Sequence, residues 1–121
     1  MMYVLENDFA MVSISSLGAE VRSFILKENQ KEYIWQGNPD VWMGRAPLVF
    51  PVVGRLKGDE YTFEGTTYYM EQHGFGSNGE FEVIKQETDC ITFSLKYNET
   101  TMQMYPFKFE LQIHYHLEGT T

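Results

Sequence analysis

The stretch FKFELQIHYHL, residues 107–117, decides the fold class. Apolar side chains stand at every second position, and lysine, glutamate, glutamine and histidine side chains stand between them. This period of two is typical of a β-strand with one face on a core and the other in solvent. We therefore expect a long, half-buried strand here. Its apolar members are Phe107, Phe109, Leu111, Ile113, Tyr115 and Leu117.

The same alternation runs through most of the chain, and no long helical pattern stands out. Gly65, at the centre of the segment EGT, predicts a tight hairpin between residues 61–63 and 67–69. A short helical turn is expected at residues 40–43, after Pro39. Further strands are expected at residues 10–14, 21–26, 32–35, 81–84 and 91–97. Together these segments predict an all-β chain of about eight or nine strands, folded as a β-sandwich.

Composition restricts the function. The 121 residues are enough for one compact domain, and 43% hydrophobic residues supply a core. The net charge of −8 argues against nucleic acid and anionic membranes as partners, because both would be repelled. No apolar run is long enough to span a membrane, and the N-terminus does not have the pattern of a signal peptide. The single cysteine cannot form an internal disulfide, so a reducing cytoplasm is the expected location.

Three side chains could be interpreted as a nucleophile or as metal ligands, but the sequence around them favours neither role. Cys90 begins a predicted strand without a basic neighbour, so an inert thiol is expected rather than a nucleophile. His114 and His116 are spaced so that both could bind one metal ion, but no third ligand is evident. We expect them to be solvent-facing positions of the strand, and we expect no metal.

Arg55 and His73 lie near the two ends of an apolar segment, FPVVGRLKGDEYTFEGTTYYMEQHGFG, residues 50–76, and each adjoins a glycine. Glycine lets the backbone approach a ligand closely. A histidine can donate to a sugar or carboxyl oxygen, or transfer a proton near neutral pH. An arginine offers a rigid fork of donors to vicinal hydroxyls. From the residue types alone, a structural role, in which the arginine binds loop carbonyls, is the favoured alternative.

A resemblance to a known protein family favours the functional interpretation of Arg55 and His73 over the structural one. Five segments occur in the order in which they occur in the aldose 1-epimerase (galactose mutarotase) family, and the chain is most similar to its LacX-like branch. Together they cover essentially the whole chain, as an N-terminal portion of a family member. The segments are Ser16-Leu17-Gly18-Ala19-Glu20, Glu32-Tyr33-Ile34-Trp35-Gln36-Gly37, Ala46 through Leu56 (APLVFPVVGRL), Gln72-His73-Gly74-Phe75 and Tyr105-Pro106-Phe107.

The resemblance implies a fold, a reaction and two site residues. The family has a large β-sandwich, the galactose mutarotase-like supersandwich, and residues 1–121 would be the N-terminal part of that one domain. Its members interconvert the α and β anomers of a hexose without a cofactor: a glutamate removes the C1 hydroxyl proton, a histidine protonates the ring oxygen, and the ring opens. Arg55 corresponds to the sugar-binding arginine. His73 corresponds to the first of two active-site histidines, which contacts the sugar near its ring oxygen.

The chain also departs from the family. The branch usually reads His-Gly-Phe-Ala-Arg, whereas Gly76 and Ser77 follow Phe75 here, so one positive group is missing. Family members are much longer, and their second histidine and catalytic glutamate fall beyond Thr121. We therefore expect this chain to be catalytically silent alone. The alternatives are a non-catalytic carbohydrate-binding module and a plain β-sheet interaction domain.

The resemblance also leads to an expectation for the strand at residues 107–117. Strands that cover its apolar face in the family would be absent from this chain. We therefore expect an uncovered apolar face and an open sheet edge, through which the chain self-associates.

Overall fold

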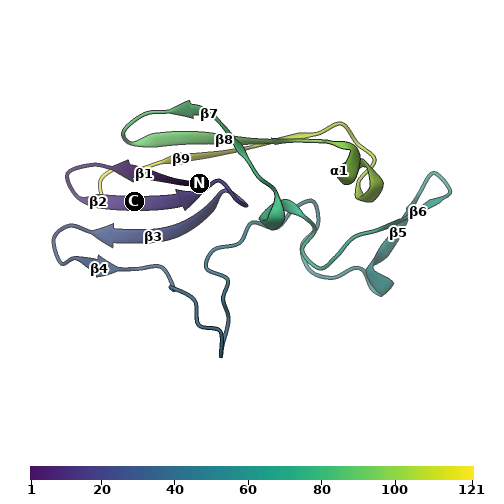
Figure 1. The fold of residues 1–121 in the computed structure, drawn as a ribbon, viewed down its shortest axis with the longest axis horizontal. Coiled ribbons are helices and arrows are strands. Elements are labelled where there is room, and N and C mark those ends of the chain that lie inside the picture. The colour runs from purple at the N-terminus through teal and green to yellow at the C-terminus, as the bar shows by residue number, and fades with distance from the viewer.

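The computed structural model describes all 121 residues and contains nine β-strands and one short α-helix. The predicted all-β class and strand number are therefore confirmed. Strands β1 to β4 form one antiparallel sheet in sequential order (Figure 1). The bounds of its strands are Met2–Glu6 for β1, Ala10–Ser15 for β2, Glu20–Leu26 for β3 and Lys31–Glu32 for β4.

Two further antiparallel sheets complete the fold. A hairpin of β5 (Glu60–Phe63) and β6 (Thr66–Tyr69) projects from one end of the molecule (Figure 1), and its turn at Glu64 and Gly65 confirms the predicted hairpin. The third sheet has the order β7-β8-β9. Its strands are Glu82–Gln86 for β7, Cys90–Lys96 for β8 and Glu110–His116 for β9, and helix α1, Glu99–Met104, lies in the connection between β8 and β9.

The core lies between the first and third sheets, which pack face to face. Phe93 on the central strand β8 is fully buried, and its ring meets Tyr3 of β1 and Tyr115 of β9 edge to face at 5.8 and 6.3 Å between centroids. The buried cluster consists of Leu5, Ala10, Val12, Ile14, Ala19, Phe81, Ile91, Phe93, Leu95 and Leu117. Burial of this apolar surface is the main stabilising term of the fold.

Strand β9 shows the predicted alternation. Leu111, Ile113 and Tyr115 are half-buried against the core, and the residues between them are exposed. The expected apolar face is partly covered rather than open: Leu117 is buried, Phe109, Leu111, Ile113 and Tyr115 are half-buried, and Phe107 is 38% exposed. The open edge is present, since β9 ends the order β7-β8-β9 and pairs only with β8.

Two local predictions need correction. The short turn expected at residues 40–43 lies at residues 38–42 and does not continue as a helix: the Asn38 carbonyl accepts from the Val41 amide at 2.9 Å and the Trp42 amide at 2.7 Å, and the Asn38 side chain accepts from the Asp40 amide. The strand expected at 32–35 ends at Glu32, because that carboxylate accepts from the Ile34 amide in place of a neighbouring strand.

The helix forms instead at α1, where Asn98 provides the N-cap. Its side chain accepts from the Thr101 amide at 2.8 Å, and the Thr101 hydroxyl accepts from the Asn98 amide at 2.8 Å. This reciprocal capping box satisfies donors that would otherwise be unpaired at the start of a helix. The helix is six residues long, and no helix of the structure is long and apolar enough to cross a membrane.

Candidate sugar site

Two loops, residues 50–55 and 73–76, lie side by side through backbone hydrogen bonds. The Phe50 carbonyl accepts from the Phe75 amide at 2.8 Å and the Gly76 amide at 3.0 Å, and the Phe50 amide donates to the His73 carbonyl at 3.1 Å. Gly74 makes this approach possible: its φ is 73°, and a Cβ there would lie 2.1 Å from the Phe50 oxygen. The structure therefore brings together the segments that carry Arg55 and His73.

Aromatic packing fixes this pair of loops on the sandwich. The Phe50 ring lies 5.9 Å from that of Phe75, 6.0 Å from Tyr105 and 5.2 Å from Phe109, which precedes β9. Such edge-on and tilted contacts add to the burial of the rings. The residues around Pro106 thus support the loop that carries Arg55, although they are far from it in sequence.

His73 is joined to Gly54 by two hydrogen bonds. Its backbone amide donates to the Gly54 carbonyl at 2.8 Å, and its ring Nδ1 accepts from the Gly54 amide at 2.9 Å. Since Nδ1 accepts, the neutral ring carries its proton on Nε2. The side chain is exposed, and the Gln72 amide nitrogen lies 3.5 Å from Nε2. His73 therefore presents a fixed N–H donor at the surface of the loop pair.

Arg55 follows Gly54 directly and is bound by a residue that the sequence did not single out. Asp59 accepts from Arg55 Nε at 2.8 Å and from one terminal nitrogen at 2.9 Å, in a two-pronged pair. The hydrogen bond from the guanidinium to Asp59, and then its charge, raise the pKa of Arg55. The two side chains are 66% and 39% exposed, so the pair adds little to the stability of the fold. The spacing of four residues was the only signal of this pair in the sequence.

A cavity of about 540 Å³ lies between the end of β6, the loop that follows it and helix α1. Asp59 and Gly74 contribute to its wall, but Arg55 and His73 do not. This cavity lacks the two side chains whose chemistry fits a sugar. We therefore place the candidate site at the exposed loop pair rather than in this cavity.

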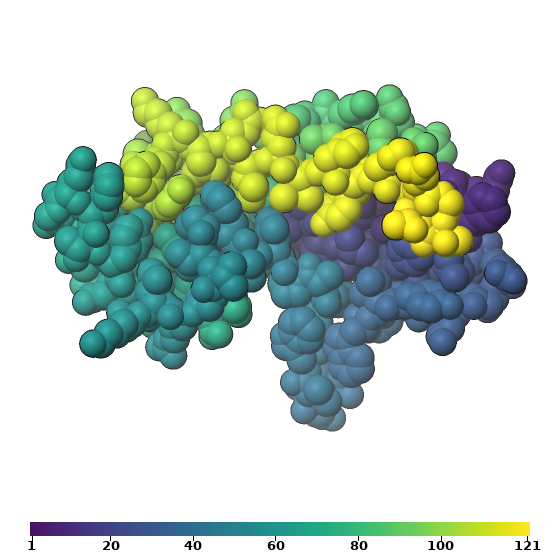
Figure 2. Space-filling view, turned by 180° about the vertical axis from the view of Figure 1, so that it is seen from behind, coloured from purple at the N-terminus to yellow at the C-terminus, as the bar shows by residue number.

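The loop between β4 and Phe50 stands out from the body of the molecule (Figure 2). Trp35 and Trp42 are both about half exposed there, and the Trp35 indole donates to the Trp42 carbonyl at 2.8 Å. Neither tryptophan joins the core.

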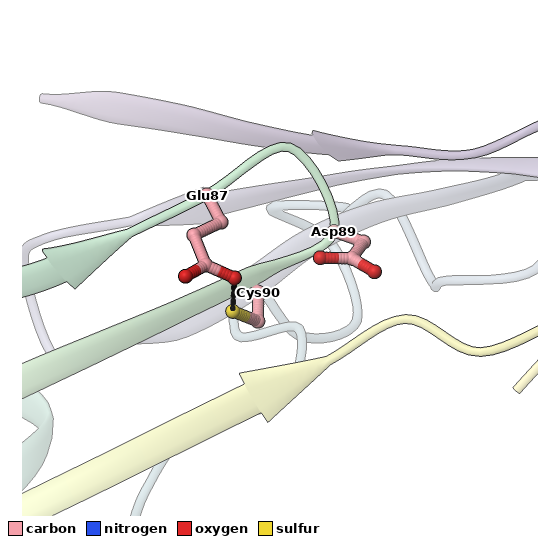
Figure 3. A group of neighbouring side chains, drawn as sticks. All are labelled: Glu87, Asp89 and Cys90. Atoms are coloured by element: carbon pink, nitrogen blue, oxygen red, sulfur yellow. Dashed lines mark hydrogen bonds between the residues drawn. The ribbon is translucent and has the colours of Figure 1, made fainter.

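One group of three side chains has ligand atoms that could bind a metal ion, and it lies far from Arg55 in sequence. Glu87, Asp89 and Cys90 come together at the turn between β7 and β8 (Figure 3), with ligand atoms within 4.8 Å of one another. The Cys90 thiol donates to Glu87 at 3.3 Å, and this bond, together with burial, raises the pKa of the thiol. A protonated thiol agrees with the inert cysteine that we expected.

The two histidines of β9 have separate partners. His114 Nδ1 lies 2.7 Å from the Thr92 hydroxyl of β8, and His116 Nε2 lies 3.6 Å from Asp89 at the neighbouring turn. Both are exposed, which confirms their solvent-facing positions.

Comparison with known proteins gives a consistent result. The model of the aldose 1-epimerase family matches residues 1–121. Protein LacX of Lactococcus lactis subsp. lactis is 32% identical over 120 residues, which are 95% of this chain and 40% of the relative. The chain thus spans about 40% of the length of the curated relatives that it matches.

Solved structures agree with this match. A galactose mutarotase related enzyme from Lactobacillus acidophilus superposes with a TM-score of 0.97 at 48% identity, over 98% of this chain and 40% of that one. A galactose mutarotase-like protein from Lactobacillus casei gives a TM-score of 0.94 at 33% identity, with the same coverage. The fold is therefore the galactose mutarotase-like β-sandwich, and the chain belongs to the aldose 1-epimerase family.

Proposed function

We propose that this chain supplies Arg55 and His73 to the hexose site of an aldose 1-epimerase. Arg55 binds sugar hydroxyls, and His73 donates from Nε2 toward the ring oxygen. The observation that carries the proposal is the bond from the Gly54 amide to His73 Nδ1 at 2.9 Å, because it leaves the opposite nitrogen as the donor. The family match supports the reaction class.

The proposed reaction needs one base and one acid. The base takes the proton of the C1 hydroxyl, and the electrons of that O–H bond form the C1 carbonyl while the bond from C1 to the ring oxygen breaks. The ring oxygen then takes a proton from the acid. Rotation about the C1–C2 bond and reversal of these steps give the other anomer. His73 assists the protonation of the ring oxygen, and no cofactor is needed.

The base and the second histidine are proposed to come from polypeptide outside residues 1–121. Asp59, the acidic residue that contacts Arg55, is occupied by that guanidinium and is not assigned as the base. By this proposal the isolated chain binds a hexose weakly and does not catalyse its mutarotation.

Polarimetry on freshly dissolved α-glucose and α-galactose tests the function. The suitable protein is a chimera in which this chain replaces the matching 40% of the Lactobacillus acidophilus relative. The chimera should accelerate mutarotation above the buffer rate, whereas the isolated chain should not. Binding of hexose without acceleration by either protein would favour the carbohydrate-binding module. A chimera that is folded but neither binds nor accelerates would refute the proposal.

A further inference from the structure

The geometry points to a role for Asp59, and this inference rests on the proposed function. The turn of residues 57–59 directs the Asp59 carboxylate back onto Arg55. Gly58 and Asp59 both have left-handed backbones, with φ of 67° and 58°, and the Asp59 amide donates to the Leu56 carbonyl at 2.9 Å. A left-handed non-glycine residue is uncommon, and such conformations gather at functional sites.

The pair determines what Arg55 presents to a ligand. A guanidinium has five N–H donors, and Asp59 accepts from two nitrogens, so about three donors remain. The carboxylate keeps unused acceptor positions beside them, and its charge offsets that of Arg55. The pair therefore offers donors and an acceptor together, with little net charge.

This combination suits one class of ligand. A sugar hydroxyl both donates and accepts, so it can bond to Arg55 and Asp59 at once. A phosphate or carboxylate offers acceptors mainly, and it meets the negative charge of Asp59 next to the arginine. We propose that Asp59 is a positioning and specificity residue: it orients Arg55 and makes the site prefer a neutral hydroxyl over an anionic group such as a phosphate ester.

The substitution Asp59→Asn tests this proposal without disturbing the turn. Asparagine is one of the few residues that tolerate the left-handed backbone, so the change removes the charge and keeps the fold. The matched control is Glu60→Gln, which removes the same charge at the next, exposed residue. Glu60 makes no side-chain ion pair or hydrogen bond in the structure.

The first measurement needs no sugar. In ¹H–¹⁵N spectra of the 121-residue chain, the Arg55 Nε–H bonded to Asp59 should exchange slowly with water. Exchange should become faster in Asp59→Asn and stay slow in Glu60→Gln. Equal exchange in the parent chain and both variants would show that Asp59 does not position Arg55.

The second measurement compares affinity for glucose and glucose 6-phosphate at low salt. The parent chain and Glu60→Gln should prefer glucose, and Asp59→Asn should shift the ratio of affinities about tenfold toward the phosphate. The same ratio in Asp59→Asn and Glu60→Gln would overturn the specificity role. A parent chain that binds neither sugar would refute the hexose site itself, and the Nε–H exchange would then decide whether Asp59 orients Arg55.

Discussion

The imidazole of His73 accepts a hydrogen bond from the backbone amide of Gly54, and the amide of His73 returns one to the Gly54 carbonyl. The ring is thus oriented by main-chain atoms of the residue that precedes Arg55. The arrangement joins the two loops of the candidate site and assigns the single proton of the neutral ring to Nε2.

The tautomer of His73 can be measured directly. In ¹⁵N NMR spectra that connect ring carbons and nitrogens, at a pH where the ring is neutral, Nδ1 should give an unprotonated signal and Nε2 a protonated one. The reason is that the Gly54 amide donates a hydrogen bond to the lone pair of Nδ1. A protonated Nδ1, or rapid averaging of the two tautomers, would contradict the geometry of the loop pair.

The substitution Gly74→Ala should unfold the loop pair. Its Cβ would lie 2.1 Å from the Phe50 carbonyl oxygen, and its φ of 73° is unfavourable for alanine. The matched control is Gly65→Ala, where φ is 80° and no atom lies within 4 Å. Denaturant unfolding should show a loss of about 1 kcal/mol for the control, from backbone strain alone, and at least about 3 kcal/mol for Gly74→Ala. Equal losses would show that the approach to Phe50 is not tight.

Much of the sandwich could be predicted because the alternation of apolar and polar residues along a strand indicates which of its faces is buried. Strand β9 is an example: Ile113 and Tyr115 pack inward while His114 faces out. Strand β1 was not predicted, because its apolar residues are not strictly alternating: Tyr3, Val4 and Leu5 are consecutive.

The wrong predictions arise where a side chain takes the place of a backbone partner. The carboxylate of Glu32 ends β4, and the side-chain oxygen of Asn38, which accepts from the Asp40 amide, places the turn at residues 38–42 instead of 40–43. The secondary-structure propensities of individual residues do not predict such hydrogen bonds between a side chain and the nearby backbone. For the site, residue types and a family resemblance singled out Arg55 and His73. The bond between Arg55 and Asp59 depends on a left-handed turn and became visible only in the structure.

Replacing Arg55 by lysine should weaken sugar binding more than turnover. A point charge on a flexible stem cannot reproduce the planar, two-pronged bond to Asp59, so the donors toward the sugar lose their orientation. In the chimera KM should rise several-fold with a smaller change in kcat, as steady-state polarimetry would report. A fall in kcat at constant KM would instead indicate a role in the transition state.

The stability of the sandwich should fall in acid, and Glu20 should contribute to this. Burial raises the pKa of this carboxyl, but hydrogen bonds from the Ala46 and Arg45 amides, with the Arg22 side chain, outweigh burial and lower the pKa below 4.5. A lowered pKa in the folded state means that the stabilisation is present above about pH 4.5 and is lost as the pH falls through the folded value.

Thermal unfolding between about pH 7 and pH 3 measures this effect. The variant Glu20→Gln should be less stable than the parent near neutral pH, and the difference should narrow in acid. Glu60→Gln, at an exposed position, should follow the parent curve. A constant difference between Glu20→Gln and the parent across this range would contradict the assignment.

The mutarotation rate of the chimera with His73 replaced by alanine tests the proposed role of this histidine most directly. The control is His114→Ala, which removes an exposed histidine of β9 that bonds only to Thr92. If His73 donates to the ring oxygen, its loss should lower turnover about 100-fold, the scale for removing an acid or polarising group, while His114→Ala keeps the parent rate. Equal rates for the folded parent chimera and His73→Ala would contradict a role of His73 in protonating the ring oxygen.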